Sequence, residues 1–205
     1  MMGFNIVNMR DMAEEMGEEY IKKVVSHFVC PYNHDVEYFL HERAYQYAVQ
    51  RVSSTHLVYA SYKDEQVLVG YYTLAQKHFH VDLKHRGKLS SKLRHRLNKF
   101  GKFDAELKKT VIAAPLIGQL GKNYADGYDK LIKGSELLKM ACDAVAAAQR
   151  LIGGKVVYLE CEDIPALKDF YKRAGFVEFG ERPLEGDEKD AYSGKYLIQM
   201  LKYLD

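Results

Sequence analysis

The amino-acid sequence predicts an α/β (α+β) fold in which one mixed sheet of about seven strands is flanked by helices. Short runs rich in β-branched and aromatic residues are bounded by glycine, proline or charged residues, as strands are. The longer segments between these runs carry apolar residues at helical spacing. With 205 residues, 47% hydrophobic and 28% charged, the chain also has the size and composition of one globular domain, residues 1–205.

The N-terminal quarter predicts one strand and two helices. Residues 4–7 form a short strand, residues 11–28 form a helix that ends before Pro31, and a second helix covers about 35–51. The expected apolar faces are Met12, Met16, Tyr20, Val24 and Phe28 in the first helix, and Phe39, Leu40, Ala44, Tyr47 and Ala48 in the second. Both faces predict helices that cover a sheet.

Residues 56–62 and 66–79 are β-rich and are joined across Lys63-Asp64-Glu65, so we expect a hairpin. The second strand of this hairpin carries His78 and His80 on one face. A metal site would need a third ligand that the sequence does not place, so we expect surface or substrate-cleft histidines and no metal.

Residues 84–109 form a strongly basic segment with ten Lys/Arg and two acidic residues, a local charge of +8. Because the whole chain carries +2, the remainder sums to −6. Leucines and a phenylalanine recur in it at helical spacing, which predicts a basic amphipathic helix between the third and fourth strands: Leu89, Leu93, Leu97 and Phe100. The segment could contact nucleic acid or an acidic protein, and Arg94 and Arg96 are then the candidate contact residues. The same charges are equally explained as the solvated face of a helix.

The second half predicts a strand at 110–121, in which Pro115 and Gly118 favour a bulge or a splayed edge. A helix follows at 134–150, with Leu137, Leu138, Ala141, Cys142 and Val145 as its apolar face. The remaining predicted elements are a strand at 156–159, a helix that ends at Gly175, a strand at 176–179, an acidic loop at 185–190 and a strand at 195–203.

The helix before Gly175 carries one tyrosine, Tyr171, that needs an explanation. Asp163 can cap this helix and Pro165 suits its first turn, while its expected buried stripe consists of Leu167, Phe170 and Ala174. Tyr171 then lies beside the stripe, with its ring packed and its hydroxyl directed into a cleft. It is either a core tyrosine or a proton donor.

The segment from Lys155 to Phe176 resembles the last block of the GNAT superfamily of acyl-CoA-dependent N-acetyltransferases, which ends in Phe-Tyr-x-x-x-Gly-Phe. The order of the predicted elements is similar to the GNAT order along nearly the whole chain. The resemblance implies that Tyr171 protonates the departing CoA thiolate. A tyrosine, with a reference pKa near 10, is protonated at neutral pH and can give its proton to a forming thiolate, whose reference pKa is about 8.5.

Residues 115–123, Pro-Leu-Ile-Gly-Gln-Leu-Gly-Lys-Asn, resemble a Gly-Arg-Leu-Ala-Val-Asp block of the GNAT toxins that acetylate the amino acid on charged tRNA. Residues 69–74 are similar to the third strand of those toxins. The resemblance implies that backbone amides of Leu120, Gly121 and Lys122 hold the pantetheine arm and the thioester carbonyl. Gln119 stands where those toxins have an arginine, a difference that concerns the substrate more than the fold.

The start of the helix at 134 is the expected pyrophosphate site, because helix N-termini offer backbone amides and a positive dipole end. Its candidate residues are Lys130, Lys133, Gly134 and Ser135. Asp129 and Ile132 depart from the family's Arg/Gln-x-x-Gly-x-Gly/Ala loop, and Ile132 brings a Cβ to a place where phosphates approach bare backbone. Gly134 has a second explanation, as a glycine that starts the helix and has no role in pyrophosphate binding. Asp163 stands where many family members have an asparagine that contacts pantetheine.

The sequence offers no carboxylate on the strand at 110–121 to act as a general base. Glu160 and Glu162 on the next strand are candidates, directly or through water, and are equally explained as solvated side chains. Without a base, an α-amine with a pKa near 8 is favoured over a lysine near 10.4 by about 3 kcal/mol of deprotonation free energy.

Cys30, Cys142 and Cys161 are widely spaced, which predicts buried thiols and neither a disulfide framework nor a zinc site. No apolar run approaches the roughly 20 residues of a membrane span, so the expected location is the cytoplasm, with no membrane partner. Because family members are often dimers, the resemblance also leads us to expect a homodimer.

The resemblance implies an acetyl-CoA-dependent N-acetyltransferase, in which a primary amine attacks the thioester directly in a ternary complex. The acceptor is a small-molecule, peptide or tRNA-linked amine. Two alternatives stay open: a toxin-like enzyme that acts on aminoacyl-tRNA, and a GNAT-fold binding module that uses its basic helix and has little catalysis.

Overall fold

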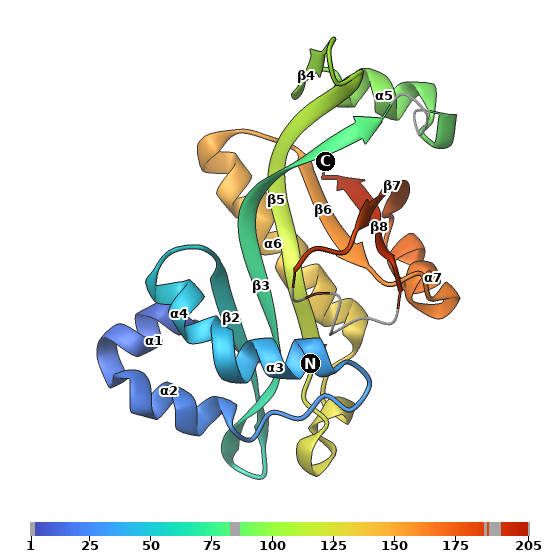
Figure 1. The fold of residues 1–205 in the computed structure, drawn as a ribbon. Coiled ribbons are helices and arrows are strands. Elements are labelled where there is room, and N and C mark those ends of the chain that lie inside the picture. The colour runs from blue at the N-terminus through green and yellow to red at the C-terminus, as the bar shows by residue number, and fades with distance from the viewer. Residues whose placement is uncertain (1–2, 83–86, 187, 189–193, 205) are drawn as a thin grey trace. The chain divides into compact units, whose positions relative to one another are not determined.

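The computed structural model describes residues 3–82, 87–186, 188 and 194–204 (Figure 1). Its strands are β1 (Phe4–Asn8), β2 (Ser54–Tyr62), β3 (Glu65–Asp82), β4 (Gly101–Asp104), β5 (Lys109–Lys122), β6 (Val156–Cys161), β7 (Val177–Pro183) and β8 (Tyr196–Tyr203). Its helices are α1 (Met9–Met16), α2 (Glu18–Val25), α3 (His34–Tyr38), the π-helical turn η1 (Phe39–Arg43), α4 (Ala44–Val49), α5 (Ser91–Leu97), the 3₁₀ helix η3 (Ala125–Lys130), α6 (Gly134–Ile152) and α7 (Pro165–Arg173).

The strands follow the order β1-β2-β3-β5-β6-β8-β7, and β4 pairs with β5. Strands β5 and β6 are parallel, whereas the pairs β1–β2, β2–β3, β6–β8 and β7–β8 are antiparallel. The predicted mixed α/β fold is therefore confirmed. The chain divides into two compact units: the first unit holds Met1–Ala75 and Gly118–Ala141, and the second unit holds Gln76–Ile117 and Cys142–Asp205.

In the first unit, α1 and α4 pack against β2 (Figure 1). The hairpin predicted between β2 and β3 is confirmed, and Tyr62 pairs with Glu65 across a turn in which Lys63 and Asp64 both have positive φ. The core of this unit consists of Met9, Ile21, Val25, Phe28, Cys30, Val36, Leu40, Ala44, Ala48, Leu57, Tyr59, Leu68 and Tyr71.

The single helix predicted for residues 11–28 is wrong, because Gly17 separates α1 from α2 with a φ of 82°. A residue in this left-handed region ends one helix and redirects the next, and glycine adopts it without strain. The predicted apolar face is consequently wrong for Met16 and Tyr20, which are exposed. Met9 and Ile21 are buried in the core instead.

The helix predicted at 35–51 is present as three consecutive segments, α3, η1 and α4. Leu40, Ala44 and Ala48 are buried as predicted, together with Val36. The π-helical turn in the middle adds a residue to the turn and so keeps these side chains on the core face.

The core of the second unit is contributed by five strands and by the segment around α5: Phe79, Val81, Leu89, Leu97, Ile112, Ala114, Val156, Tyr158, Phe179 and Leu201. The basic segment is only partly helical, since α5 covers seven residues and a strand, β4, follows it. Strand β4 pairs with β5 from Gly101 to Asp104, and a Cβ at Gly101 would lie 2.6 Å from Thr110 Cγ2. The prediction of one helix therefore missed a hairpin, and positions 84–86 of that segment lie outside the described residues.

Strand β6 pairs with β5 at Leu116–Tyr158 and Ile117–Leu159, whereas its pairing with β8 continues to Cys161. This short pairing with β5 agrees with the splayed edge expected beside Pro115 and Gly118. The helix predicted at 134–150 is confirmed as α6, and all five residues of its expected apolar face are buried.

Candidate functional site

Helix α7 in the second unit presents Tyr171 to the protein interior. The helix has Pro165 in its first turn and is followed by Gly175 at a φ of 87°, both as predicted. Tyr171 is 9% exposed and is the buried residue of this helix, whereas Leu167, Phe170 and Ala174 are half-buried. The predicted buried stripe was therefore misplaced by one position, and Tyr171 is the centre of the packing face.

Aromatic rings surround Tyr171, with the Phe170 ring centroid at 5.0 Å and that of Phe176 at 6.0 Å. Burial raises the pKa of Tyr171 above its ordinary value, and the nearby Cys161 thiol adds to this effect. Burial also raises the pKa of Cys161, to about 12. The Tyr171 hydroxyl is therefore protonated at every physiological pH, as a proton donor must be before the reaction.

Asp163 does not cap α7, because the N-cap residue is Ile164 and no side chain caps the helix. Instead, the Asp163 carboxylate accepts hydrogen bonds from Lys168 Nζ and, at 3.3 Å, from the Tyr196 hydroxyl. The hydrogen bond from Lys168 lowers the pKa of Asp163. The capping prediction was thus wrong, and this carboxylate joins the start of α7 to β8.

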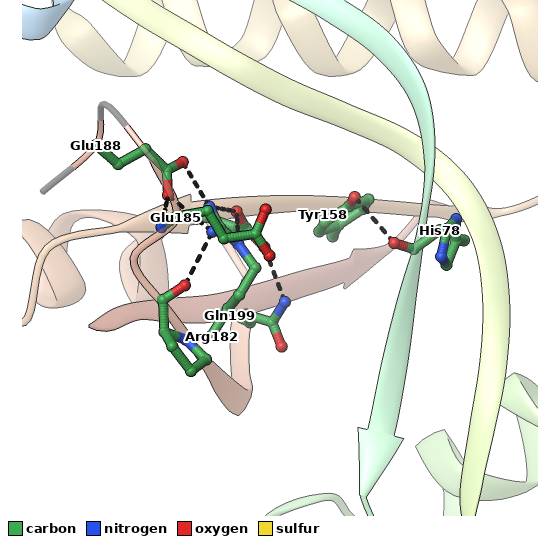
Figure 2. Close-up of polar contacts among 8 residues, drawn as sticks. His78, Tyr158, Arg182, Glu185, Glu188 and Gln199 are labelled. Carbon is green, nitrogen blue, oxygen red and sulfur yellow. Dashed lines mark hydrogen bonds and ion pairs between the residues drawn. The ribbon is translucent and has the colours of Figure 1, made fainter. Parts of the chain in front are cut away.

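Glu160 is engaged in a network centred on Arg182 (Figure 2). Arg182 Nη2 lies 2.7 Å from Glu160 Oε2, and the two Nη atoms each lie 2.8 Å from a different oxygen of Glu188. Gln199 donates to the other Glu160 oxygen at 2.8 Å. These contacts raise the pKa of Arg182, with Glu188 as the largest cause. Both oxygens of Glu160 already accept hydrogen bonds, which argues against Glu160 as a general base; Glu162 is half-buried.

In the first unit, the end of β5 packs closely against α3. A Cβ on Gly121 would lie 2.3 Å from Val36 Cγ1 and 3.2 Å from Phe28 Cζ, so glycine is needed for this approach. The Tyr71 hydroxyl donates to the Val36 carbonyl oxygen at 2.5 Å. Leu120 and Lys122 beside Gly121 are half-buried. Close packing is therefore enough to explain why residue 121 is a glycine. The predicted role of the Gly121 amide in holding the pantetheine arm is compatible with this packing.

Two side chains at the end of β5 have polar partners. Gln119 Nε2 donates to Asp35 Oδ2 of α3 at 2.8 Å. Lys122 Nζ donates to the carbonyl oxygen of Asp129 at 2.9 Å and lies 3.9 Å from the Asp129 carboxylate. The cation of Lys122 therefore holds the segment that leads from β5 to α6.

The loop before α6 differs from the sequence expectation at Ile132, which is 2% exposed. Its side chain is therefore packed inside the protein. Lys130, Lys133 and Ser135 are exposed and Gly134 is half-buried. The Lys133 amide donates to the Glu136 carboxylate at 2.8 Å, as in half of a capping box. Two exposed lysines, Lys130 and Lys133, thus lie in the segment just before the N-terminus of α6.

The two arginines predicted to contact a partner are half-buried in the second unit. Arg94 Nη2 donates to Ser91 at 3.1 Å, and the Arg96 guanidinium lies over the Tyr203 ring at 4.5 Å from its centroid. Lys92, Lys99, Lys102 and Lys108 of the same segment are exposed. These lysines are better placed than the arginines to meet a polyanion.

Among the described residues, no group of three or more His, Cys, Asp or Glu is placed to hold a metal ion. The rings of His78 and His80 lie side by side, with centroids 5.4 Å apart. Within the same part of the chain, no helix is long and apolar enough to cross a membrane.

Sequence reasoning missed Asp35, Lys168 and Arg182. Gln119, which donates a hydrogen bond to Asp35, is 84 residues away in the sequence, so no local pattern could have identified the pair. Lys168 was detectable, since it follows Asp163 by five positions across the start of a predicted helix.

No protein-family model matches the chain, and no curated protein matches it. Several solved structures are similar to it. A tyrosine-to-phenylalanine mutant of KacT has a TM-score of 0.59 and 16% identity, covering 95% of this chain and 93% of that chain. AtaT complexed with acetyl-methionyl-tRNAfMet has a TM-score of 0.57 and 18% identity, covering 96% and 94%. AtaTR bound with AcCoA has a TM-score of 0.52 and 15% identity, covering 95% and 91%. The chain therefore has the GNAT fold predicted from its sequence, and its likeness to toxin structures of that fold is confirmed.

Proposed function

We propose that this protein is an acetyl-CoA-dependent N-acetyltransferase that acts on a primary amine in a ternary complex. The amine nitrogen forms a bond to the thioester carbon, the carbon–sulfur bond breaks, and the CoA sulfur takes the proton of the Tyr171 hydroxyl. The nitrogen releases its extra proton to water, and water returns a proton to the Tyr171 phenolate. The observation that carries the proposal is Tyr171 itself, protonated and packed on the last turn of α7 in a chain with the GNAT fold.

The similar structures support the co-substrate, because AtaTR was solved bound with AcCoA. In this chain, the first turn of α6 suits the pyrophosphate, since Lys130 and Lys133 are exposed beside its N-terminus and the Ile132 side chain is turned inward. We assign the binding of the pantetheine arm to the backbone of Leu120, Gly121 and Lys122. We assign a further contact with that arm to Asp163, which directly precedes α7.

Calorimetry with acetyl-CoA tests the first half of the proposal, and we expect saturable binding at micromolar concentrations. Absence of binding at high micromolar acetyl-CoA would contradict both enzyme hypotheses and leave a GNAT-fold binding module. Release of CoA thiol in the presence of amino acid esters, a dipeptide or spermidine then tests transfer.

Replacement of Tyr171 by phenylalanine removes the proton donor and keeps the ring. We expect kcat to fall on the order of 10²- to 10⁴-fold, the usual contribution of a general acid, with unchanged acetyl-CoA affinity. Tyr20→Phe on α2 is the matched control and should keep full activity. Because burial raises the pKa of Tyr171 above 10, the wild-type rate should not decline between pH 8 and pH 10. A Tyr171→Phe rate equal to the wild-type rate would exclude this role.

A toxin-like activity on aminoacyl-tRNA is the second candidate. It is favoured by the structure of AtaT with acetyl-methionyl-tRNAfMet and by the exposed lysines of the basic segment. Expression in a bacterial host should arrest growth for the wild type and not for Tyr171→Phe. Equal growth of the two strains would argue against a toxin while leaving the acetyltransferase intact.

A further inference from the structure

A cavity of about 380 Å³ lies between the turn that joins β2 to β3 and the 3₁₀ helix η3. Figure 1 shows this turn and the segment after β5 at the same end of β3 and β5. The lining comes entirely from the first unit and consists of Tyr62, Lys63, Glu65, Val67, Asp126 and Tyr128. Small-molecule sites in proteins have volumes of about 300–1,000 Å³, so a cavity near the lower end of this range suits a ligand group the size of a nucleoside.

The two walls of this cavity are fastened to each other by Asn123, which is 1% exposed. Its side-chain oxygen accepts a hydrogen bond from the Ala125 amide at 3.1 Å, at the start of η3. Its side-chain nitrogen donates to the Leu68 carbonyl oxygen of β3 at 2.9 Å. Lys122 holds the other end of η3 through the Asp129 carbonyl oxygen. Because the walls are held without a ligand, binding needs to order little of the chain.

Two tyrosine rings give the cavity an aromatic surface. The rings of Tyr62 and Tyr128 meet edge to face, with centroids 6.0 Å apart. Tyr62 is 37% exposed and Tyr128 is half-buried, so both side chains are accessible, whereas Val67 is buried. Aromatic side chains of this kind stack on planar rings such as nucleobases.

The charged groups around these rings select the kind of planar ligand. Lys63 Nζ already lies over the Tyr62 ring, 5.1 Å from its centroid, in the place that a ligand cation would take. A second cation there would be repelled by the Lys63 ammonium. The exposed carboxylates of Glu65 and Asp126 are hydrogen-bond acceptors, which match a neutral ring that carries an amino group. Adenine is such a ring.

The cavity also adjoins, along the chain, the segment assigned to the pyrophosphate. Tyr128 precedes the exposed lysines Lys130 and Lys133 by two and five residues, and α6 begins directly after them. In acetyl-CoA the adenosine is bonded to the pyrophosphate through its 5′ oxygen and carries a phosphate on its 3′ oxygen. An acetyl-CoA molecule with its pyrophosphate at the start of α6 can therefore reach the cavity with its adenosine.

We infer that this cavity binds the 3′-phosphoadenosine end of acetyl-CoA. This inference rests on the proposed acetyltransferase function. The adenine ring stacks on the rings of Tyr62 and Tyr128. Its amino group, which has two N–H bonds, donates to the carboxylates of Glu65 and Asp126. The Lys63 ammonium pairs with the 3′-phosphate.

The first test is calorimetry with acetyl-CoA on the wild type, Tyr128→Ala and Tyr20→Ala. Tyr20 is the matched control, because it is an exposed tyrosine of α2 and does not line the cavity. We expect Tyr128→Ala to weaken binding about 5- to 150-fold, as loss of one base–aromatic stack does. Tyr20→Ala should bind acetyl-CoA like the wild type.

A second test does not depend on the half-buried Tyr128. Lys63 is exposed in the turn and has a positive φ, which asparagine also adopts, so Lys63→Asn removes the ammonium and suits the turn. We expect the wild type to bind acetyl-CoA about three- to tenfold more tightly than acetyl-dephospho-CoA, which lacks the 3′-phosphate. The Lys63→Asn protein should bind these two ligands equally.

The outcomes separate this inference from the proposed function. If the wild type does not bind acetyl-CoA, the acetyltransferase function fails and this inference fails with it. If the wild type binds acetyl-CoA, the function stands, and only the adenosine site is overturned when Tyr128→Ala binds equally tightly or when Lys63→Asn still discriminates between the two ligands. If Tyr128→Ala does not fold, the comparison in Lys63→Asn decides alone.

Spermidine tests the other occupant, an organic amine. We expect no saturable binding of spermidine that depends on Tyr128. Spermidine binding to the wild type that is lost in Tyr128→Ala, with acetyl-CoA binding unchanged, would make the cavity an amine site and overturn the inference.

Discussion

Asp35 in the first unit and Glu160 in the second are both half-buried carboxylates, but different kinds of side chain donate hydrogen bonds to them. Asp35 is oriented by the neutral amide of Gln119. Glu160 receives the guanidinium of Arg182 on one oxygen and the amide of Gln199 on the other. The contact between Glu160 and Arg182 is an ion pair, whereas the contact between Asp35 and Gln119 is a hydrogen bond from a neutral amide. The first ties two strands together, and the second ties α3 to the end of β5.

The largest expected effect is on stability, from Arg182→Met. This change leaves Glu160 and Glu188 near each other without their cation, and loss of one partner from a buried ion pair costs more than the pair contributes. Because Arg182 is 25% exposed and Glu188 is 31% exposed, we expect a loss of about 1–3 kcal/mol in the free energy of unfolding, less than for a fully buried pair. Urea denaturation measures it.

Arg182→Lys is the control, since it keeps the charge and loses the two-pronged geometry, and its loss should be smaller. Adding Glu160→Gln to Arg182→Met should recover part of the stability. A double variant as unstable as the single one would show that the network acts through packing and not through charge.

The next effect comes from Gly121→Ala, which tests how closely α3 and β5 must pack. The added Cβ would overlap Val36, so we expect a loss of about 1–3 kcal/mol in the free energy of unfolding. We also expect a lower rate, because the β5 backbone that we assign to the pantetheine arm must move. Gly87→Ala is the control, since a Cβ there meets nothing within 4 Å. A Gly121→Ala protein with wild-type rate and stability would show that α3 is not held in this way.

The smallest effect is expected for Glu160→Gln, which keeps an acceptor oxygen for Arg182. We expect kcat to stay within about twofold of the wild-type value, against a loss on the order of 10²- to 10⁴-fold for Tyr171→Phe. Release of CoA thiol measures both. A large loss of kcat in a stable Glu160→Gln protein would show that Glu160 acts as a general base despite its hydrogen bonds.

Much of the fold could be predicted, because strands and long helices leave periodic patterns in the sequence. The β2–β3 hairpin and α6 follow from local sequence patterns. So do the two ends of α7, where Pro165 lies in the first turn and Gly175 follows the last. Gly17 was misjudged, since a glycine inside an apolar period is compatible with either a continuous helix or a break. Strand β4 was missed because its four residues carry no β-rich run, and it is held by pairing with β5.

The sequence predicted the positions of Tyr171 on a helix and of Gly134 at a helix start, because contiguous motifs carry them; their roles in a site stay predictions. The candidate site was not predictable where it depends on contacts between distant residues. The pair formed by Asp35 and Gln119, and the inward turn of Ile132, become evident only when helices are packed on strands. Asp163 was misassigned because an acidic residue before a helix fits a cap and a salt bridge equally well.

The burial of all three cysteines has a practical consequence for studying this protein. Cys30, Cys142 and Cys161 are buried, and burial raises the pKa of the Cys30 and Cys161 thiols, so little reactive thiolate is present at neutral pH. Disulfide reagents that measure released CoA thiol should therefore react little with the thiols of the native protein, so the background signal should be low. The purified chain should also tolerate air without reducing agents, which would interfere with such a colorimetric readout.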